Sequence, residues 1–335
     1  MTSLMGNMMK SQKILDKTPV INENKQDDVG LKFHSGLVHI IAIVFLLIAT
    51  PVIAAPVTTE VPSSISYFTT AEKAADKLYE GILAKDGVSI KSLFGEEYLH
   101  LLPLDEVDEL DRLMFIKAWD KSHKLVAGEQ DELFVEVGTK GWTFPVPLIK
   151  NVDGWYFDVL SGLEIIRIRA IGRNELSTIQ AALAYYDAQK EYAEVDRNAN
   201  GRLEYAQKFI STAGQKDGLY WETEVTEPLS PLGALYSSEN TDGIYHGYHY
   251  KIIKKQGVNA RGGAYDYIKN NHMRYGFALL AWPAEYGETG VMSFIINQDG
   301  IIYDKNLGAD TAKLAAEIDS FDPGSDWEAV DDISL

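Results

Sequence analysis

The stretch Ala181–Phe209, AALAYYDAQKEYAEVDRNANGRLEYAQKF, indicates how the chain is organised. It predicts a long helix, a tight polar loop and a shorter second helix over Leu203–Ile210. Five residues give the loop its character: Asp196, Asn198, Asn200, Gly201 and Glu204. Alternating side-chain oxygens around a glycine turn are typical of the start of a calcium loop.

We therefore predict a metal site at four side chains, Asp196, Asn198, Asn200 and Glu204, with Ca²⁺ as the candidate cofactor. Only two of the four are acidic, and Gln207 stands where a calcium loop normally carries a bidentate Glu, so the expected affinity is weak. The alternative is structural. Asn200 and Gly201 would form a left-handed helix stop, and their polar neighbours would cap the next helix.

Composition bounds the class of protein. A length of 335 residues suits two domains or one large one. The chain has no cysteine, which excludes disulfides, thiolate metal sites and a cysteine nucleophile. Its formal net charge of −18 would repel phosphate backbones, so we expect no nucleic-acid partner.

The N-terminal segment predicts export. Residues 37–49 are apolar, no Lys, Arg, Asp or Glu occurs from Phe33 to Thr59, and Val52-Ile53-Ala54 has the A-x-A-like arrangement of a cleavage site. This is the pattern of a signal peptide over residues 1–54, cleaved after Ala54, and it places the mature protein in the periplasm or beyond. The alternative is an uncleaved inner-membrane anchor formed by residues 36–55, which approach the ~20 residues needed to span a bilayer.

After a linker over residues 55–66, rich in Pro, Thr, Ser and Val, we expect an N-terminal domain over residues 67–165. Thr69 and Glu72 form a capping-box pair that predicts the start of its first helix. The other expected elements are helices over Ser89–Phe94 and Asp105–Ser122 and strands over Glu132–Val137, Trp142–Ile149 and Trp155–Val159. Helices followed by a curved antiparallel sheet resemble the cone-shaped NTF2-like fold.

The second expected domain covers residues 166–330 and is also α+β. Helices are predicted over Leu163–Ala170 and Glu175–Val195, with a break near Gly172 and Asn174 as a cap. Antiparallel strands are predicted over Gly247–Lys254, Phe277–Trp282, Val291–Asn297 and Gly300–Asp304, followed by a helix over Lys313–Ile318. Asp299-Gly300 is a strong hairpin signal. A long helix on such a sheet resembles pilin-like domains.

Many short segments also resemble one bacterial family. They include GWTFPVPLIK (141–150), IGRNEL (171–176), DAQKEY (187–192), DRNANGRLEYAQ (196–207), YHGY (245–248) and GVMSF (290–294). Together, from about Tyr67 to Trp327, they look like the exported family known as domain of unknown function 2950. The resemblance implies an exported or envelope-associated protein and no particular activity. The family's loop is commonly richer in aspartate than this one, which lowers the metal affinity expected here.

No catalytic signature is present: no H-E-x-x-H, G-x-S-x-G, phosphate loop or dinucleotide fingerprint. The first hypothesis is therefore a non-catalytic module that binds an envelope protein or polymer, with membrane contact only through the N-terminal segment. The second is an envelope hydrolase that uses Glu191 with His246, which requires these two residues and Arg173 to converge in one pocket. The third is a membrane-anchored, pilin-like accessory protein. His246 and His249 are expected on opposite faces of one strand, so they would not share a metal.

Overall fold

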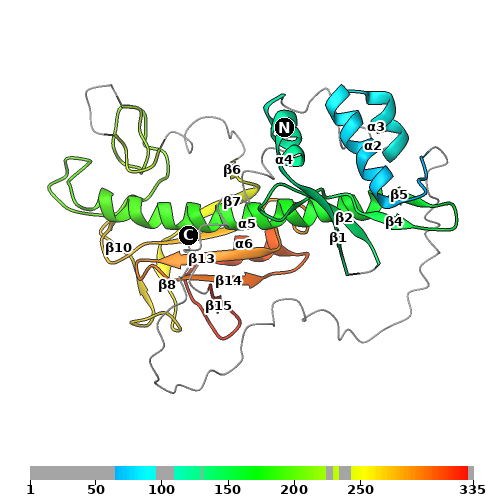
Figure 1. The fold of residues 1–335 in the computed structure, drawn as a ribbon. Coiled ribbons are helices and arrows are strands. Elements are labelled where there is room, and N and C mark those ends of the chain that lie inside the picture. Colours follow the sequence, from blue (N-terminus) through cyan, green and yellow to red (C-terminus); the bar gives the residue numbers. More distant parts are fainter. Residues whose placement is uncertain (1–64, 96–108, 130, 224–228, 234–242, 331–335) are drawn as a thin grey trace, which may run out of the picture. The chain divides into compact units, whose positions relative to one another are not determined.

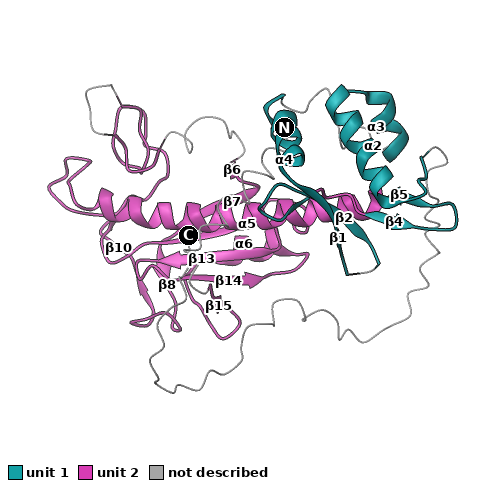
Figure 2. Ribbon diagram, in the orientation of Figure 1, with its two compact units in different colours: residues 1–143, 148–157 teal, residues 144–147, 158–335 magenta. Residues whose placement is uncertain are grey.

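The computed structural model describes residues 65–95, 109–129, 131–223, 229–233 and 243–330, and these form an α+β protein (Figure 1). The predicted signal peptide or anchor lies outside the described residues. Two compact units share the chain (Figure 2). Unit 1 comprises Met1–Thr143 and Leu148–Phe157, and unit 2 comprises Phe144–Pro147 and Asp158–Leu335. No helix within the described ranges combines the length and apolarity that crossing a bilayer requires.

Unit 1 begins with helices α2 (Ala71–Ala84), α3 (Gly87–Phe94) and α4 (Glu109–Lys121). The N-cap of α2 is Thr70, whose hydroxyl accepts from Lys73 N at 3.3 Å, so the predicted pair of Thr69 and Glu72 was wrong by one residue. Lys85 follows α2 as its C-cap and adopts the left-handed conformation with φ 53°. Asp86 then caps α3 by accepting from Val88 N and Ser89 N.

The sheet of unit 1 has five antiparallel strands in the order β1-β2-β4-β5, with β3 also paired to β2. They are β1 (His123–Ala127), β2 (Leu133–Val137), β3 (Trp142–Thr143), β4 (Leu148–Lys150) and β5 (Trp155–Phe157). The single strand predicted over Trp142–Ile149 is in fact two. Pro145 and Pro147 have no N–H to donate to a ladder, so the segment between β3 and β4 leaves the sheet.

Unit 2 is built on one continuous helix, α5 (Val159–Tyr192), which lies along a six-stranded sheet (Figure 1). Its N-cap is Asp158, which accepts from Ser161 N and Ser161 Oγ. The predicted break near Gly172 was wrong. One glycine costs a helix interior only about 1 kcal/mol, and contacts on both sides of Gly172 outweigh that cost. Asn174 is therefore a mid-helix residue, and its side chain bonds outside the helix instead of capping it.

The six strands are antiparallel in the order β15-β14-β13-β12-β7-β6. Their bounds are β6 (Ile244–Tyr245), β7 (Tyr248–Ile253), β12 (Ala278–Pro283), β13 (Met292–Asn297), β14 (Ile302–Asn306) and β15 (Glu328–Ala329). The predicted hairpin at Asp299-Gly300 is confirmed. It joins β13 to β14, Gly300 has φ 77°, and its N–H donates to Asn297 O at 2.9 Å. Helix α6 (Thr311–Glu317) packs against β12.

Two small hairpin sheets complete unit 2: β8 (Lys255–Gln256) with β9 (Tyr265–Asp266), and β10 (Ile268–Lys269) with β11 (His272–Met273). The core of the unit joins α5 to β12 and β13. Tyr185, fully buried on α5, donates its hydroxyl to Ala278 O at 3.2 Å. Burial raises the pKa of Tyr185 well above its usual range, so this residue stays a neutral donor.

Candidate functional site

The polar loop after α5 closes on itself through one carboxylate. Asp196 accepts from Asn200 N at 3.0 Å and from Gly201 N at 2.7 Å. Ala199 and Gly201 both have positive φ, 56° and 80°, and a glycine suits the second of these positions because it has no Cβ to clash. The turn therefore has the glycine-centred form that a calcium loop requires.

The second helix predicted over Leu203–Ile210 does not form, and that prediction was wrong. The chain instead runs extended, with isolated bridges from Tyr205 to Met273 and from Ile210 to Tyr220. The physical reason is Gln189, a buried residue of α5. Its Oε1 accepts from Ala206 N at 2.9 Å, and its Nε2 donates to Ala206 O at 2.8 Å. Because one side chain satisfies both backbone groups of Ala206, neither is available to a helix.

Glu204 lies two residues before this anchor and is only 8% exposed. Its Oε1 accepts from the side-chain amides of Asn198, at 2.6 Å, and Asn200. Its Oε2 accepts from His272 Nδ1 at 2.6 Å. Burial by itself would raise the pKa of Glu204, but the three hydrogen bonds outweigh it and hold the pKa below its ordinary value. Glu204 is therefore a carboxylate at neutral pH, fixed in one orientation.

His272 reaches Glu204 because of a tight hairpin. Asn270 and Asn271 join β10 to β11 with φ values of 51° and 66°, the positive values of a two-residue turn. Gln207 Nε2 donates to Asn271 O at 2.8 Å and fastens this turn to the loop. Sequence reasoning missed His272, which lies far along the chain from Glu204. The Asn270-Asn271 dipeptide was the local signal for the hairpin that brings the two together.

These residues line a pocket of about 410 Å³, which we call the Glu204 pocket. Its described lining is Tyr192, Asn198, Asn200, Glu204, Tyr205, Gln207, Lys208, Asp217, Lys254, Asn271 and His272. Every one of these side chains carries a hydrogen-bonding group. Burial, together with the charges of Glu204 and Asp217, raises the pKa of Tyr192 to about 12. The pocket therefore has a polar wall of neutral, anionic and cationic groups.

The two lysines of the pocket differ. Lys208 Nζ pairs with Asp217 Oδ2 at 2.6 Å and also donates to Thr212 Oγ1. Burial would raise the pKa of Asp217, but its bonds with Lys208 and Thr212 lower it overall. The side-chain ammonium of Lys254 has neither a hydrogen bond nor an ion pair within the part of the chain that the structure describes, although the backbone carbonyl of this residue accepts from Tyr267 N. It is the cation of this wall that an incoming group can engage.

The structure brings the four predicted metal residues into one loop, and their hydrogen bonds bear on whether Ca²⁺ fits. Asn198 and Asn200 turn their amide nitrogens toward Glu204, so both amides would have to rotate half a turn to offer Ca²⁺ an oxygen. Both oxygens of Asp196 already accept from the loop backbone. Across the described ranges, no group of three or more acidic or histidine side chains is placed to hold a metal. Calcium binding at this loop stays a prediction.

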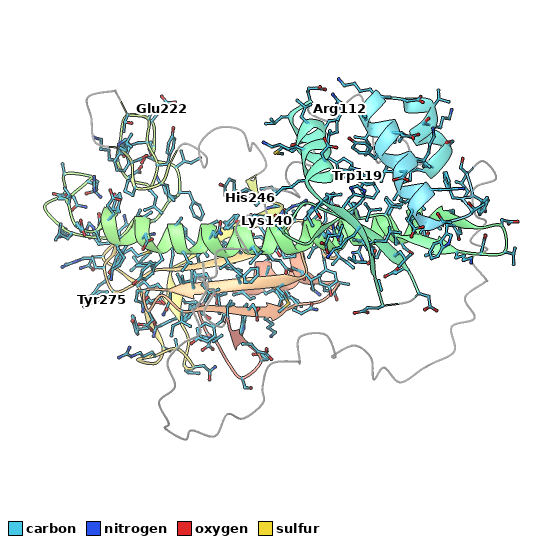
Figure 3. The ribbon with its side chains drawn as sticks, in the orientation of Figure 1. Arg112, Trp119, Lys140, Glu222, His246 and Tyr275 are labelled. Atoms are coloured by element: carbon cyan, nitrogen blue, oxygen red, sulfur yellow. The ribbon has the colours of Figure 1, made fainter. Side chains whose placement is uncertain are left out.

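The residues named for a hydrolase do not line the Glu204 pocket. Glu191 is exposed and pairs with Arg197 at 3.7 Å, and Arg173 lies midway along α5. His246 (labelled in Figure 3) belongs to the turn between β6 and β7, with φ 51°, and not to a strand. The prediction that His246 and His249 occupy opposite faces of one strand was therefore wrong. Burial lowers the pKa of His246.

A family model described as a protein of unknown function, DUF2950, matches residues 66–330. The chain belongs to this family. Neither a comparison with curated proteins nor one with solved structures gave a match. The NTF2-like and pilin-like resemblances accordingly stay predictions, and the α+β class stands on the structure of this DUF2950 chain itself.

Three of the segments that carry the DUF2950 resemblance, IGRNEL, YHGY and GVMSF, meet in unit 2. From IGRNEL, Asn174 Nδ2 donates to Thr289 O at 2.9 Å, and Glu175 accepts from Val291 N and Met292 N at 2.9 and 3.0 Å. These contacts tie the middle of α5 to the start of β13. Gly247, from YHGY, has φ 77°, and a Cβ there would meet both Asn174 and Thr289 at 2.9 Å. This group of motif residues has a structural role, whereas the loop DRNANGRLEYAQ forms the pocket wall.

Proposed function

We propose that this DUF2950 protein is exported and binds a polar, hydroxyl-rich part of a cell-envelope polymer in the Glu204 pocket. The observation that carries the proposal is Glu204 itself. Three donors from two separate segments hold a buried carboxylate in place at the wall of a pocket. Polar groups that are fixed before binding lose little freedom when a ligand arrives, so such a wall can select hydroxyl groups by their geometry.

The charge balance supports a polar ligand over a strongly charged one. Two carboxylates and two ammonium groups line the pocket, and one pair, Lys208 with Asp217, neutralises itself. The chain as a whole carries −18. Acidic polymers would be repelled at long range, whereas neutral or zwitterionic polymers would not. A hydroxyl-rich envelope polysaccharide meets these conditions.

Export is part of the proposal and rests on the N-terminal sequence. An apolar run over residues 37–49 followed by Val52-Ile53-Ala54 in the A-x-A-like arrangement is the form of a cleaved signal. The intact mass of the protein recovered from the envelope tests this point. A mature chain that begins at Ala55 supports export with cleavage, and a chain that keeps residues 36–55 in the membrane fraction supports the anchor instead.

The binding proposal is tested by co-sedimentation of the mature chain with purified, protein-free cell-wall sacculi. Asn198→Trp places a bulky ring in the pocket, and Arg202→Trp adds the same ring to an exposed loop residue outside the lining. We expect wild type and Arg202→Trp to sediment and Asn198→Trp to stay in solution. Thermal unfolding curves should show that all three proteins are folded at the temperature of the assay. Equal retention of the two variants, or no retention of the wild type, would contradict the assignment of the pocket.

A further inference from the structure

We propose that His272 is a general base that hydrolyses an acyl ester on the ligand held in the Glu204 pocket. The inference rests on the proposed binding site and goes beyond it, because it assigns turnover to a site so far argued only to bind. It also names a different acid–base pair from Glu191 and His246, which the structure does not bring together at this pocket.

The proton positions follow from the contact between the two side chains. Glu204 is a carboxylate and can only accept, so the 2.6 Å contact requires His272 Nδ1 to carry the hydrogen. With Nδ1 protonated, the neutral form of the ring has its lone pair on Nε2. Nε2 has no hydrogen-bond partner in the described parts of the chain, and His272 lines the pocket. A buried carboxylate that fixes the tautomer of a histidine at a pocket wall, and leaves the second ring nitrogen without a partner, is the arrangement of a general base.

The support behind His272 is rigid. Asn198 and Asn200 hold the other carboxylate oxygen of Glu204, and Gln189 anchors the extended segment two residues further on, at Ala206. The turn that carries His272 is fastened by Gln207. Glu204 is thus a positioning residue, because it orients His272 and does not itself exchange a proton with water or with the ester.

The chemistry of the wall favours an ester. Hydrolysis of a glycosidic bond needs two carboxyl groups, one on each side of the bond. Here Glu204 already accepts hydrogen bonds from three donors, and Asp217 is bonded to Lys208 and Thr212. Neither carboxylate is therefore free to act on a glycosidic bond. Hydrolysis of an ester needs one base that takes a proton from water and returns it to the leaving oxygen, and His272 alone can do both.

The step balances without a cofactor. A water oxygen bonds to the acyl carbon while Nε2 of His272 takes one of its protons. The tetrahedral oxyanion faces a lining that includes the unpaired ammonium of Lys254. The bond from the acyl carbon to the ligand oxygen then breaks, the imidazolium returns its proton to that oxygen, and the products are a carboxylic acid and the free hydroxyl.

The test uses p-nitrophenyl acetate as the probe and the mature chain as the enzyme. His272→Asn removes the base. His123→Asn and His249→Asn are matched controls, because neither residue lines the pocket. We expect His272→Asn to lower kcat/KM about 100-fold, within the range for loss of a general base, and each control to stay within about twofold of wild type. We expect Glu204→Gln to lower kcat with KM unchanged and to shift the imidazole ¹⁵N signals of His272 away from the Nδ1–H tautomer.

His272 also fastens a hairpin, so a test without substitution is needed. Carbethoxylation of folded wild type by diethyl pyrocarbonate should abolish hydrolysis in step with modification of His272, as followed by peptide mass. The proposal is overturned if His272→Asn retains the wild-type rate, or if folded wild type is no faster than the urea-unfolded chain. Should sacculus binding persist while hydrolysis is absent, this inference fails and the proposed binding function stands.

Discussion

Replacing Gln189 with leucine tests the contact that gives the loop its shape. Leucine has nearly the same size, so the change leaves little cavity and mainly removes hydrogen bonds. Gln189 is fully buried, and Ala206 is 1% exposed. The substitution leaves the N–H and C=O of Ala206 without partners and takes a donor away from Tyr185 Oη.

The size of the effect follows from those orphaned groups. An unpartnered buried polar group costs about 1–3 kcal/mol. Two such groups, partly offset by the apolar surface of leucine, lower the free energy of unfolding of unit 2 by about 3 kcal/mol. For a unit of this size, the loss corresponds to a fall in Tm of roughly 6–12 °C.

Urea unfolding followed by tryptophan fluorescence measures the change, with Gln180→Leu as the control. Gln180 is exposed on the same helix, and its substitution should change the free energy by less than about 0.5 kcal/mol. A loss under about 1 kcal/mol for Gln189→Leu, or equal losses for the two variants, would show that Gln189 does not hold the extended segment in place.

Three further predictions concern the loop and its neighbours. If the loop holds calcium, millimolar Ca²⁺ should raise the Tm of wild type, and Asp196→Ala should abolish the rise. An unchanged wild-type Tm would refute the prediction of a calcium site. Glu204 has a lowered pKa, so it stabilises the fold above its unfolded pKa of about 4.3, and this contribution is lost as the pH falls through the folded value. The Tm difference between wild type and Glu204→Gln should therefore narrow as the pH falls below about 4.3; a difference that widens below that pH contradicts the assignment. Glu175→Ala leaves two backbone N–H groups unpaired and should cost about 2–3 kcal/mol in urea unfolding, whereas a loss below about 0.5 kcal/mol would show that the contact is dispensable.

Local sequence patterns predicted much of the fold. The strands of unit 2 and the hairpin at Asp299-Gly300 follow from alternating apolar residues and one turn dipeptide, which are properties of neighbouring residues. The same kind of signal marked a break at Gly172 that does not occur. Glu175 and the residues that it contacts at the start of β13 are more than a hundred positions apart in the chain. No pattern of neighbouring residues can therefore predict this contact.

The sequence indicated only the local part of the candidate site. The spacing of Asp196, Asn198, Asn200 and Glu204 in one loop suggested a metal site, which stays a prediction, and three of the four, Asn198, Asn200 and Glu204, line the Glu204 pocket. His272 could not be found in this way, because the contact that joins it to Glu204 spans 68 positions. The helical pattern over Leu203–Ile210 was misleading for a related reason, since Gln189 takes up the backbone groups that a helix would need.

The most direct test of the account is a chemical-shift map of the ¹⁵N-labelled mature chain during titration with soluble fragments of envelope polysaccharide. The account predicts that the largest changes fall on the side-chain amides of Asn198 and Asn200, on the imidazole of His272 and on the backbone of the turn at Asn271. Saturable shifts concentrated on another surface, or none at millimolar fragment, would contradict the claim that the Glu204 pocket is where this protein works.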